Sequence, residues 1–339
     1  MRNVLRINKR KISKVIVVVM MYVMSLSVAK ASSASLDFVV NPIYPSSQIE
    51  GNTSYYNLLL EPGVKETIQL EVVNTSSEDI EVEISTHTAF TNVNGVVEYA
   101  SDAEEYDKSL EYRLGEIISS PGIIDVSGNE TKVIDLAFEM PSESFEGIIA
   151  GGIRLSQVNS PDESEASEGF SINNEIIYVI SVLLRNNEER VAGDLELLDV
   201  YANQVNYRNV ISAKLQNFEP GFINQLEVEA QVRALGEEEV LYESSSSGMQ
   251  MAPNSFLEYP ISLNGERHRP GKYVLNLVAR SHDEEWVFEQ EFEIESDIAN
   301  DLNAADVTID NSINWWAVGF IGVILVFVIY IVIEKKKKK

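Results

Sequence analysis

Histidine and cysteine are the residues with which this sequence could most directly build a metal site. The chain of 339 residues has no cysteine and three histidines, His87, His268 and His282. The histidines do not show the H-E-x-x-H or H-x-x-x-H spacing of a zinc site, and a cysteine-based zinc cluster is excluded. The sequence therefore predicts no metal site and no metal-dependent chemistry, and it leaves open low-affinity binding of divalent cations by the acidic loops.

Acidic residues are the most abundant groups that could do acid–base chemistry. The chain has 53 Asp and Glu residues, so many carboxylate pairs arise by chance and no single pair indicates a glycosidase. There is no G-x-S-x-G nucleophile elbow. The glycine-rich run Phe145–Leu155 lacks the G-K-[ST] ending of a phosphate-binding loop. We expect no enzymatic activity and no cofactor.

The last residues have the pattern of a membrane anchor. Nineteen residues from Trp315 to Ile333 carry no charge, and as a helix they are about 28 Å long, close to the ~30 Å hydrocarbon core of a bilayer. Trp315 and Trp316 suit a headgroup layer, and a lysine tail suits the cytoplasmic surface. The tail comprises Glu334 and Lys335, Lys336, Lys337, Lys338 and Lys339. The sequence predicts a single-pass protein of a Gram-positive plasma membrane, with span 315–333, cytoplasmic tail 334–339 and all earlier domains outside; the alternative is a buried helix.

The N-terminus has the pattern of a secretory leader. Six basic residues precede an apolar run from Val15 to Val28, which Ala29-Lys30-Ala31 follows. The run is about 21 Å long as a helix, short for a second span. We expect a signal peptide over residues 1–31, with cleavage after Ala31; cleavage at Ala34 and an uncleaved anchor are the alternatives.

The segment between leader and span is strongly acidic. It holds 14 of the 26 basic residues and 52 of the 53 acidic residues, a net charge near −38. Such a surface repels nucleic acid and favours cationic partners in a salt-dependent way, although charge also keeps an exported protein soluble. No nucleic-acid partner is expected.

Apolar residues alternate with polar ones from Asp37 onward, which predicts half-buried strands. Ile68–Val72 and Ile80–Ile84 alternate on either side of turn-forming residues, so we expect them to form a hairpin-like pair. Asn94-Gly95 predicts a further hairpin. The apolar strand Ile176–Leu184 is expected to pair with Ile148–Leu155, whose glycines indicate a bulge or a close backbone approach. We place the first β-sandwich at residues 32–189, with about 165 as the alternative boundary.

The second unit, residues 190–296, has the spacing of one immunoglobulin-like sandwich. Its last strand carries Trp286, Phe288, Phe292 and Ile294 at one parity, which predicts a core face. Seven strands are expected, over 195–201, 210–216, 226–232, 240–242, 256–263, 273–279 and 286–294. Residues 297–314 are acidic and aperiodic and are expected to form a stalk. The fold class is therefore all-β: two immunoglobulin-like β-sandwiches in tandem, then a stalk and one transmembrane helix.

Three segments together resemble the WxL-interacting proteins of Gram-positive bacteria. They are Asn57–Asn74, Phe145–Leu155 and Met251–Ser255, in the order leader, two all-β domains, span and lysine tail. The resemblance implies a peptidoglycan-binding first domain, a host-binding second domain and a secreted WxL-domain protein as partner. It also implies peptidoglycan and a host extracellular matrix protein as ligands.

The residues expected to face these partners lie in two segments. The glycine-rich run and the loop 41–56 are the candidates, although strand packing and turn geometry are the favoured explanation of the same residues. The candidates are Phe145, Gly147, Gly151, Gly152, Tyr44, Tyr55 and Tyr56.

These features predict a membrane-anchored adhesion scaffold that holds a secreted WxL protein and cell-wall peptidoglycan at the surface. The alternative is a tethered assembly chaperone that captures client strands by β-augmentation at the edge of Ile176–Leu184. A spacer without a ligand is the third reading.

Overall fold

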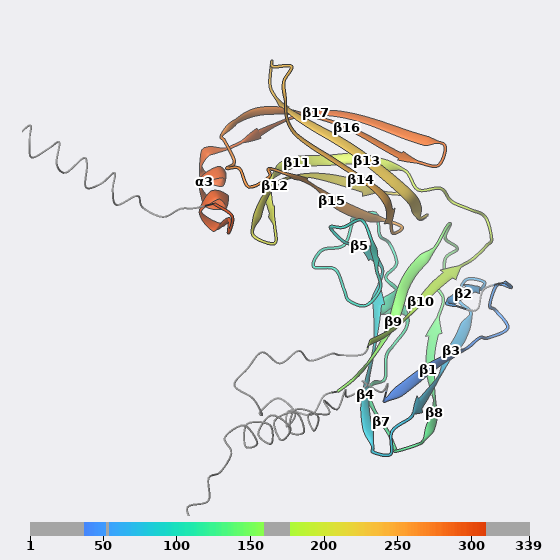
Figure 1. The fold of residues 1–339 in the computed structure, drawn as a ribbon. Helices are drawn as coiled ribbons and strands as arrows, with labels where there is room; N and C mark the ends of the chain where they lie inside the picture. The colour runs from blue at the N-terminus through green and yellow to red at the C-terminus, as the bar shows by residue number, and fades with distance from the viewer. Residues whose placement is uncertain (1–36, 52–53, 159–176, 310–339) are drawn as a thin grey trace, which may run out of the picture.

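The first domain is a β-sandwich at the N-terminal side of the molecule (Figure 1). The computed structural model describes residues 37–51, 54–158 and 177–309. The elements of the first domain are β1 (Phe38–Ile43), β2 (Tyr56–Leu59), β3 (Lys65–Asn74), β4 (Ile80–Thr88), β5 (Phe90–Thr91), β6 (Val97–Glu98), α2 (Leu114–Ile117), β7 (Gly122–Val126), β8 (Thr131–Glu139), β9 (Ile149–Gln157) and β10 (Ile177–Arg185).

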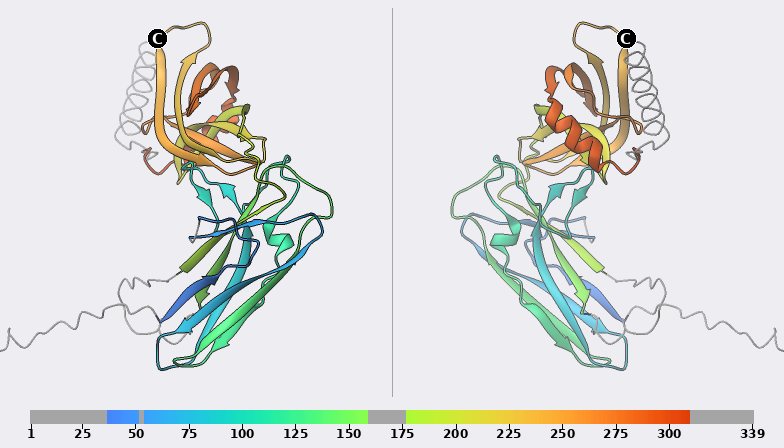
Figure 2. Two further views of the ribbon diagram at one scale, coloured as in Figure 1. Left: turned by 90° about the vertical axis from the view of Figure 1, so that its right-hand side faces the viewer. Right: turned by 90° about the vertical axis from the view of Figure 1, so that its left-hand side faces the viewer.

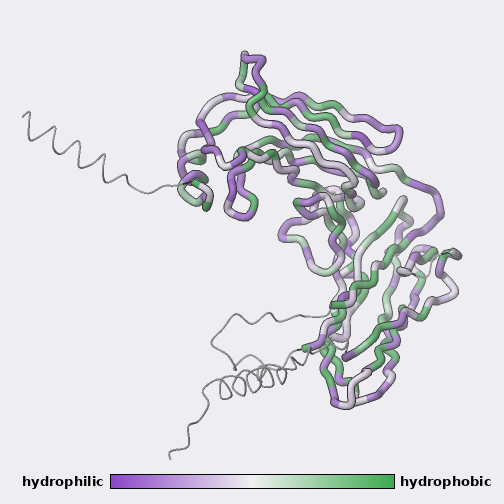
Figure 3. Tube along the Cα trace, in the orientation of Figure 1, coloured by the Kyte–Doolittle hydropathy of each residue, from purple (hydrophilic) through white to green (hydrophobic). Residues whose placement is uncertain are grey.

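Two sheets of this domain face each other across one apolar core. The sheet orders are β1-β3-β8 and β2-β10-β9-β4-β7. β3 shows why the strands form: Ile68, Leu70 and Val72 are fully buried, whereas the residues between them are half exposed. Alternation of this kind along the strands is visible in Figure 3. The predicted pairing of β9 with β10 is confirmed, in antiparallel register from Ile177↔Ser156 to Leu184↔Ile149.

The predicted hairpin between β3 and β4 is wrong, because the two strands belong to opposite sheets. Buried Asn74 holds the connection through which the chain crosses from the sheet of β3 to the sheet of β4. Its side-chain amide donates to the carbonyls of Glu78, Val126 and Ser127 at 2.7, 3.0 and 3.1 Å. These bonds tie the turn to the neighbouring β7–β8 connection. The Asn94-Gly95 turn does join a hairpin, β5 with β6.

The second domain is the seven-stranded unit that its strand spacing predicts, and all seven strands form. Its elements are β11 (Leu195–Val205), β12 (Arg208–Asn217), β13 (Ile223–Ala234), β14 (Val240–Met251), β15 (Ser255–Ser262), β16 (Gly271–Ser281), β17 (Glu284–Ile294) and α3 (Ser296–Ala305). The sheets are β11-β12-β15 and β14-β13-β16-β17. In β17, Phe292 and Ile294 are buried, and Trp286 and Phe288 pack against the same core. The all-β expectation is confirmed for both domains.

The predicted stalk is wrong over its first half, because α3 folds back onto the second domain (Figures 1 and 2). Ala299 is fully buried in the core, and Asn303 and Asp306 are buried as well. The packing of α3 could not be predicted from the sequence, because its few buried residues do not form an apolar stripe with helical periodicity.

The predicted leader, residues 1–31, and the predicted span, Trp315–Ile333, lie outside the described residues. Within the described ranges, no helix is long and apolar enough to cross a membrane. The structural boundary between the domains falls between Arg185, which ends β10, and Leu195, which begins β11.

Candidate functional site at the domain junction

The two domains meet through a small apolar cluster. Its buried members come from both domains: Ala89, Val97, Ala150, Leu183 and Ala252, with Tyr55, Tyr99, Ile148 and Phe222 packed around them. Burial raises the pKa of Tyr99 to about 12. Backbone hydrogen bonds cross the junction from Ile148 N–H to the Pro220 carbonyl, 2.9 Å, and from Gln250 N–H to the Gly95 carbonyl, 2.7 Å. The domains are therefore joined by backbone pairing as well as by side-chain packing.

The segment Met251–Ser255 forms the centre of this junction. Ala252 is fully buried, and its N–H donates to the Thr91 hydroxyl at 2.9 Å. The hydroxyls of Thr91 and Ser255 are 2.6 Å apart, and Ser255 also donates to the Ala252 carbonyl at 2.8 Å. Asn254 adopts a left-handed backbone conformation, φ 48°, which asparagine tolerates better than most residues. One of the segments that carry the family resemblance is thus an interdomain joint.

Glycines of the predicted run Phe145–Leu155 allow close backbone approaches, and one of these, at Gly147, lies at the interdomain joint. A Cβ on Gly147 would lie 2.2 Å from the Pro220 carbonyl oxygen. Gly151 and Gly152 are buried in β9, where a Cβ would lie 2.2 Å from the His87 carbonyl oxygen and 2.5 Å from that of Tyr99, respectively. The sequence indicated either a bulge or a close backbone approach for these glycines, and the structure shows the close approach. The register of β9 with its two neighbours shows no bulge.

The predicted aromatic residues divide between core and surface. Tyr56 is fully buried, donates to the Gln69 carbonyl at 2.7 Å and packs 5.2 Å from the Tyr44 ring, centroid to centroid. Phe145 is half buried, with its ring centroid 5.8 Å from that of Tyr112. These two rings line a cleft of about 400 Å³ beside the junction. Phe145 is therefore placed where a ligand could reach it, whereas Tyr56 contributes to packing.

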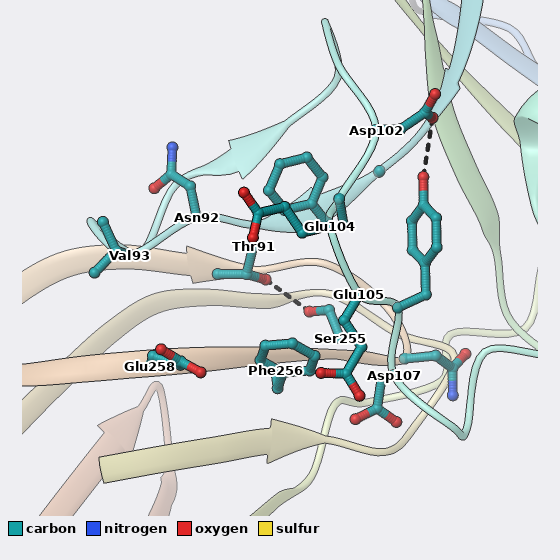
Figure 4. Close-up of a pocket in the computed structure, with 15 residues that line it drawn as sticks. Thr91, Asn92, Val93, Asp102, Glu104, Glu105, Asp107, Ser255, Phe256 and Glu258 are labelled. Atoms are coloured by element: carbon teal, nitrogen blue, oxygen red, sulfur yellow. Dashed lines mark hydrogen bonds between the residues drawn. The ribbon is translucent and has the colours of Figure 1, made fainter. Parts of the chain in front are cut away.

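A larger cleft, about 520 Å³, opens on the junction between the β5 hairpin, the loop 102–107 and the start of β15 (Figure 4). Three aromatic side chains and five carboxylates line it. They are Phe90, Tyr106 and Phe256, with Asp102, Glu104, Glu105, Asp107 and Glu258. Rings offer flat apolar surface and carboxylates accept hydrogen bonds, a combination that suits hydroxyl- or amine-bearing ligands.

Several of these carboxylates are already engaged within the protein. Asp107 is buried and accepts from Ser109 and from Gln216 of the second domain, both at 2.7 Å. Asp102 accepts from Tyr106 at 2.9 Å, and Glu258 from Tyr201 at 2.7 Å.

These contacts also affect the neighbouring phenols. Burial, and then the carboxylate of Asp102, raise the pKa of Tyr106. Glu104 and Glu105 are exposed at the mouth of the cleft. Those two residues are the carboxylates best placed to meet a ligand.

Sequence reasoning did not identify Glu104 or Glu105, because 52 acidic residues in the outer segment made each one equally plausible. These two residues differ from the other acids in their position, because Asp107 holds their loop against the second domain. Trp286, for which a core role was favoured, packs on the core and donates to Asp194 at 2.7 Å. Trp315, Trp316 and the lysine tail lie outside the described residues.

The chain matches two models of one protein family. Residues 38–157 match the peptidoglycan binding domain of the WxL Interacting Protein, and residues 167–304 match its host binding domain. Both models describe binding domains, in line with the expectation that the chain is not an enzyme. The second match begins before β10, although β10 pairs within the first domain.

Solved structures resemble the chain at low identity. The CsuC–CsuE complex of Acinetobacter baumannii pili is 14% identical, covers 76% of this chain and 98% of its own, and has a TM-score of 0.30. The E. coli chaperone DraB is 13% identical with 76% and 98% coverage and a TM-score of 0.27. The PapD-like domain of human CEP192 is 14% identical with 46% and 89% coverage and a TM-score of 0.27. None of the curated proteins compared matches the chain.

The two family models cover both folded domains in order and together extend over most of the sequence. The chain belongs to the family of WxL-interacting proteins.

Proposed function

We propose that this protein is a membrane-anchored scaffold of a Gram-positive cell surface that holds peptidoglycan and a secreted WxL protein by noncovalent contacts. The observation that carries the proposal is the order of two binding domains, matched by the peptidoglycan and host binding models, on one joined unit. The segment Trp315–Ile333 would anchor it, with Trp315 and Trp316 at the outer interface. A host matrix protein is the further ligand that the second domain would take.

We assign peptidoglycan to the cleft in Figure 4, which residues of both domains line at their junction. Sugar rings have apolar faces that pack on aromatic side chains, and their hydroxyl groups donate to carboxylates. Free amines of peptide stems are attracted by the same carboxylates. In this proposal Phe90 and Phe256 provide the apolar surface, while Glu104 and Glu105 provide the acceptors.

Sedimentation of the full chain with purified sacculi tests this assignment. Replacing both Glu104 and Glu105 with Gln should weaken binding on the order of tenfold, because hydrogen bonds to charged groups contribute about 1.5–3 kcal/mol. The matched control replaces Glu237 and Glu238 with Gln. These are two exposed acids of a second-domain turn, and the control changes the net charge by the same amount as the cleft variant. Equal loss in both variants would show that overall charge, and not the cleft, governs binding.

One observation favours the assembly chaperone as a second candidate. β10 has a strand partner on its β2 side over Val182–Arg185, but its first residues lack one within the described part of the chain. A chaperone would release its client to an assembly, whereas a scaffold retains it. The rate at which a bound WxL protein dissociates when a competing wall fragment is added separates the two functions.

A further inference from the structure

We infer that the first half of β10, Ile177–Ser181, is a docking edge that takes an extended strand of the secreted WxL partner. The inference rests on the proposed function, since that partner is its occupant. β2 already pairs with β10 in parallel, from Val182↔Tyr56 to Arg185↔Leu59. An incoming strand would therefore extend along an edge that the protein itself uses for strand pairing.

The direction of the backbone groups follows from one hydrogen bond. Leu60 N–H donates to the Arg185 carbonyl at 3.0 Å, so the backbone groups of Arg185 point to the β2 side. The register of β10 with β9 runs from Ile177 to Leu184 without a shift. Because alternate residues of a strand direct their backbone groups to the same side, Ile177 and Val179 present their N–H and carbonyl groups at this edge. Among the described residues, no strand accepts them.

Side chains at the edge indicate what kind of strand would fit. Ile177 and Val179 are 42% and 41% exposed, so two apolar side chains on one face of this strand are accessible to solvent. Between them Tyr178 turns inward, where its ring lies 5.1 Å from Phe38 of β1 and its hydroxyl donates to the Phe38 carbonyl at 3.2 Å. The docking edge thus has an exposed apolar face outside and an aromatic pair inside.

The edge adjoins the outermost strand of the other sheet of the first domain. β1 is the outermost strand of its own sheet and pairs with β3 alone among the described strands. Figures 1 and 2 show β1 and the start of β10 bordering the same side of the first domain, where Tyr178 links the two sheets. Five residues of edge correspond to about 17 Å of strand.

The occupant is a segment of about five residues with apolar side chains at alternate positions. Apolar residues on its outer face would pack beside Ile177 and Val179, as cross-strand neighbours do. The segment would lack acidic residues, because the outer part of this protein has a net charge near −38. Affinity would come from main-chain hydrogen bonds and selectivity from the alternating side chains.

Proline substitutions at neighbouring positions test the edge directly. Val179→Pro removes an N–H that faces the open edge, a position where proline is tolerated in a strand. Ile180→Pro instead removes an N–H on the β9 side and should unfold the domain. Val179→Thr keeps the N–H and a β-branched shape, and it serves as the matched control.

The measurement is the affinity of the full chain in detergent for the purified WxL protein of the same bacterium, together with the melting temperature of each variant. We expect Val179→Pro to fold and to lose at least tenfold in affinity, with Val179→Thr within threefold of the unmodified chain. Ile177→Pro, at the first residue of the strand, is the second variant if Val179→Pro does not fold.

Three outcomes would overturn the inference. If Val179→Pro and Ile177→Pro both bound the WxL protein with the affinity of the unmodified chain, the partner would dock elsewhere, and the proposed function would remain intact. Destabilisation by Val179→Pro as severe as that by Ile180→Pro would show that the chain itself already covers the edge. No binding of the WxL protein by the unmodified chain would remove the proposed function and the inference together.

Discussion

The two sandwiches end differently, although both are built from two facing sheets. β10 is the last strand of the first domain. Among the described strands, its residues Ile177–Ser181 pair only with β9. β17 completes the second domain and leads into α3, which folds back onto the core. The first ending leaves main-chain groups directed outward, whereas the second buries the chain as it leaves the domain. Partner capture is therefore expected at the first ending and mechanical attachment at the second.

Buried amide side chains hold the second ending in place. Asn303 of α3 accepts from His268 N–H at 2.8 Å and from Asn209 at 2.9 Å, and it donates to the His268 carbonyl at 2.9 Å. Asp306 accepts from Asn209 N–H at 2.7 Å. Burial acts to raise the pKa of Asp306, but hydrogen bonds from Thr308 and Asn209 outweigh it, so the pKa is lowered and the carboxylate stays charged. This network fixes the direction in which the chain leaves the domain.

Removing the centre of the network should have the largest effect. Asn303→Ala leaves the buried N–H and carbonyl groups of His268 and the Asn209 amide without this partner, at about 1–3 kcal/mol each. We expect a loss of about 3–5 kcal/mol in the free energy of unfolding, measured by urea denaturation. Asp301→Ala, on the exposed side of the same helix, should change it by less than about 0.5 kcal/mol. Equal effects would contradict the closed ending.

A second comparison concerns the joint between the two domains. Gly147 and Gly63 both have positive φ, 72° and 70°, but a Cβ would clash with Pro220 at Gly147 and would meet nothing within 4 Å at Gly63. Gly63→Ala should cost about 1 kcal/mol from backbone strain, and Gly147→Ala about 2–3 kcal/mol because the interdomain contact is lost as well. Differential scanning calorimetry should show separate melting of the two domains for Gly147→Ala. A single transition at the position given by Gly63→Ala would show that the joint tolerates the methyl group.

A smaller effect should appear on acidification. Burial lowers the pKa of His268 below the usual 6.5, and its Nε2 lies 3.2 Å from the Asn203 carbonyl oxygen, which it meets as a neutral donor. In the unfolded chain the imidazole binds a proton first as pH falls, so stability declines below about pH 6.5 until the folded-state pKa is reached. His268→Gln should remove part of this decline, on the order of 1 kcal/mol between pH 7.5 and 5.5. The same slope in both proteins would exclude His268 as its source.

Sequence patterns were sufficient to predict the strands, which depend on the two-residue alternation of apolar and polar side chains. All seven strands of the second domain, the β9–β10 pairing and the β5–β6 hairpin could be predicted because alternation and turn residues are local signals. The partners of β3 and β4 could not, since a strand that crosses to the opposite sheet alternates in the same way as one in a hairpin. Asn74, which ties that crossing, reads in the sequence as an ordinary turn residue.

The candidate cleft was not predictable from the sequence, because none of the predicted ligand-facing residues lines it. The glycines at positions 147, 151 and 152 indicated close backbone approach, and the structure shows that the neighbours are other backbone carbonyls. Glu104 and Glu105 had no signal of their own, because the role proposed for them depends on which loop the second domain contacts. α3 was missed for a related reason: Asn303 is buried by hydrogen bonding and not by hydrophobicity.

Amide hydrogen exchange of the full chain, with and without the WxL protein, tests the central claim of an open first ending and a closed second one. In the unbound chain, Ile177 and Val179 should exchange rapidly while Ile180 is protected by β9. Binding should slow exchange at Ile177 and Val179 and leave β17 and α3 unchanged. Protection of those two amides before the partner is added, or slowing confined to the second domain after it, would contradict the account.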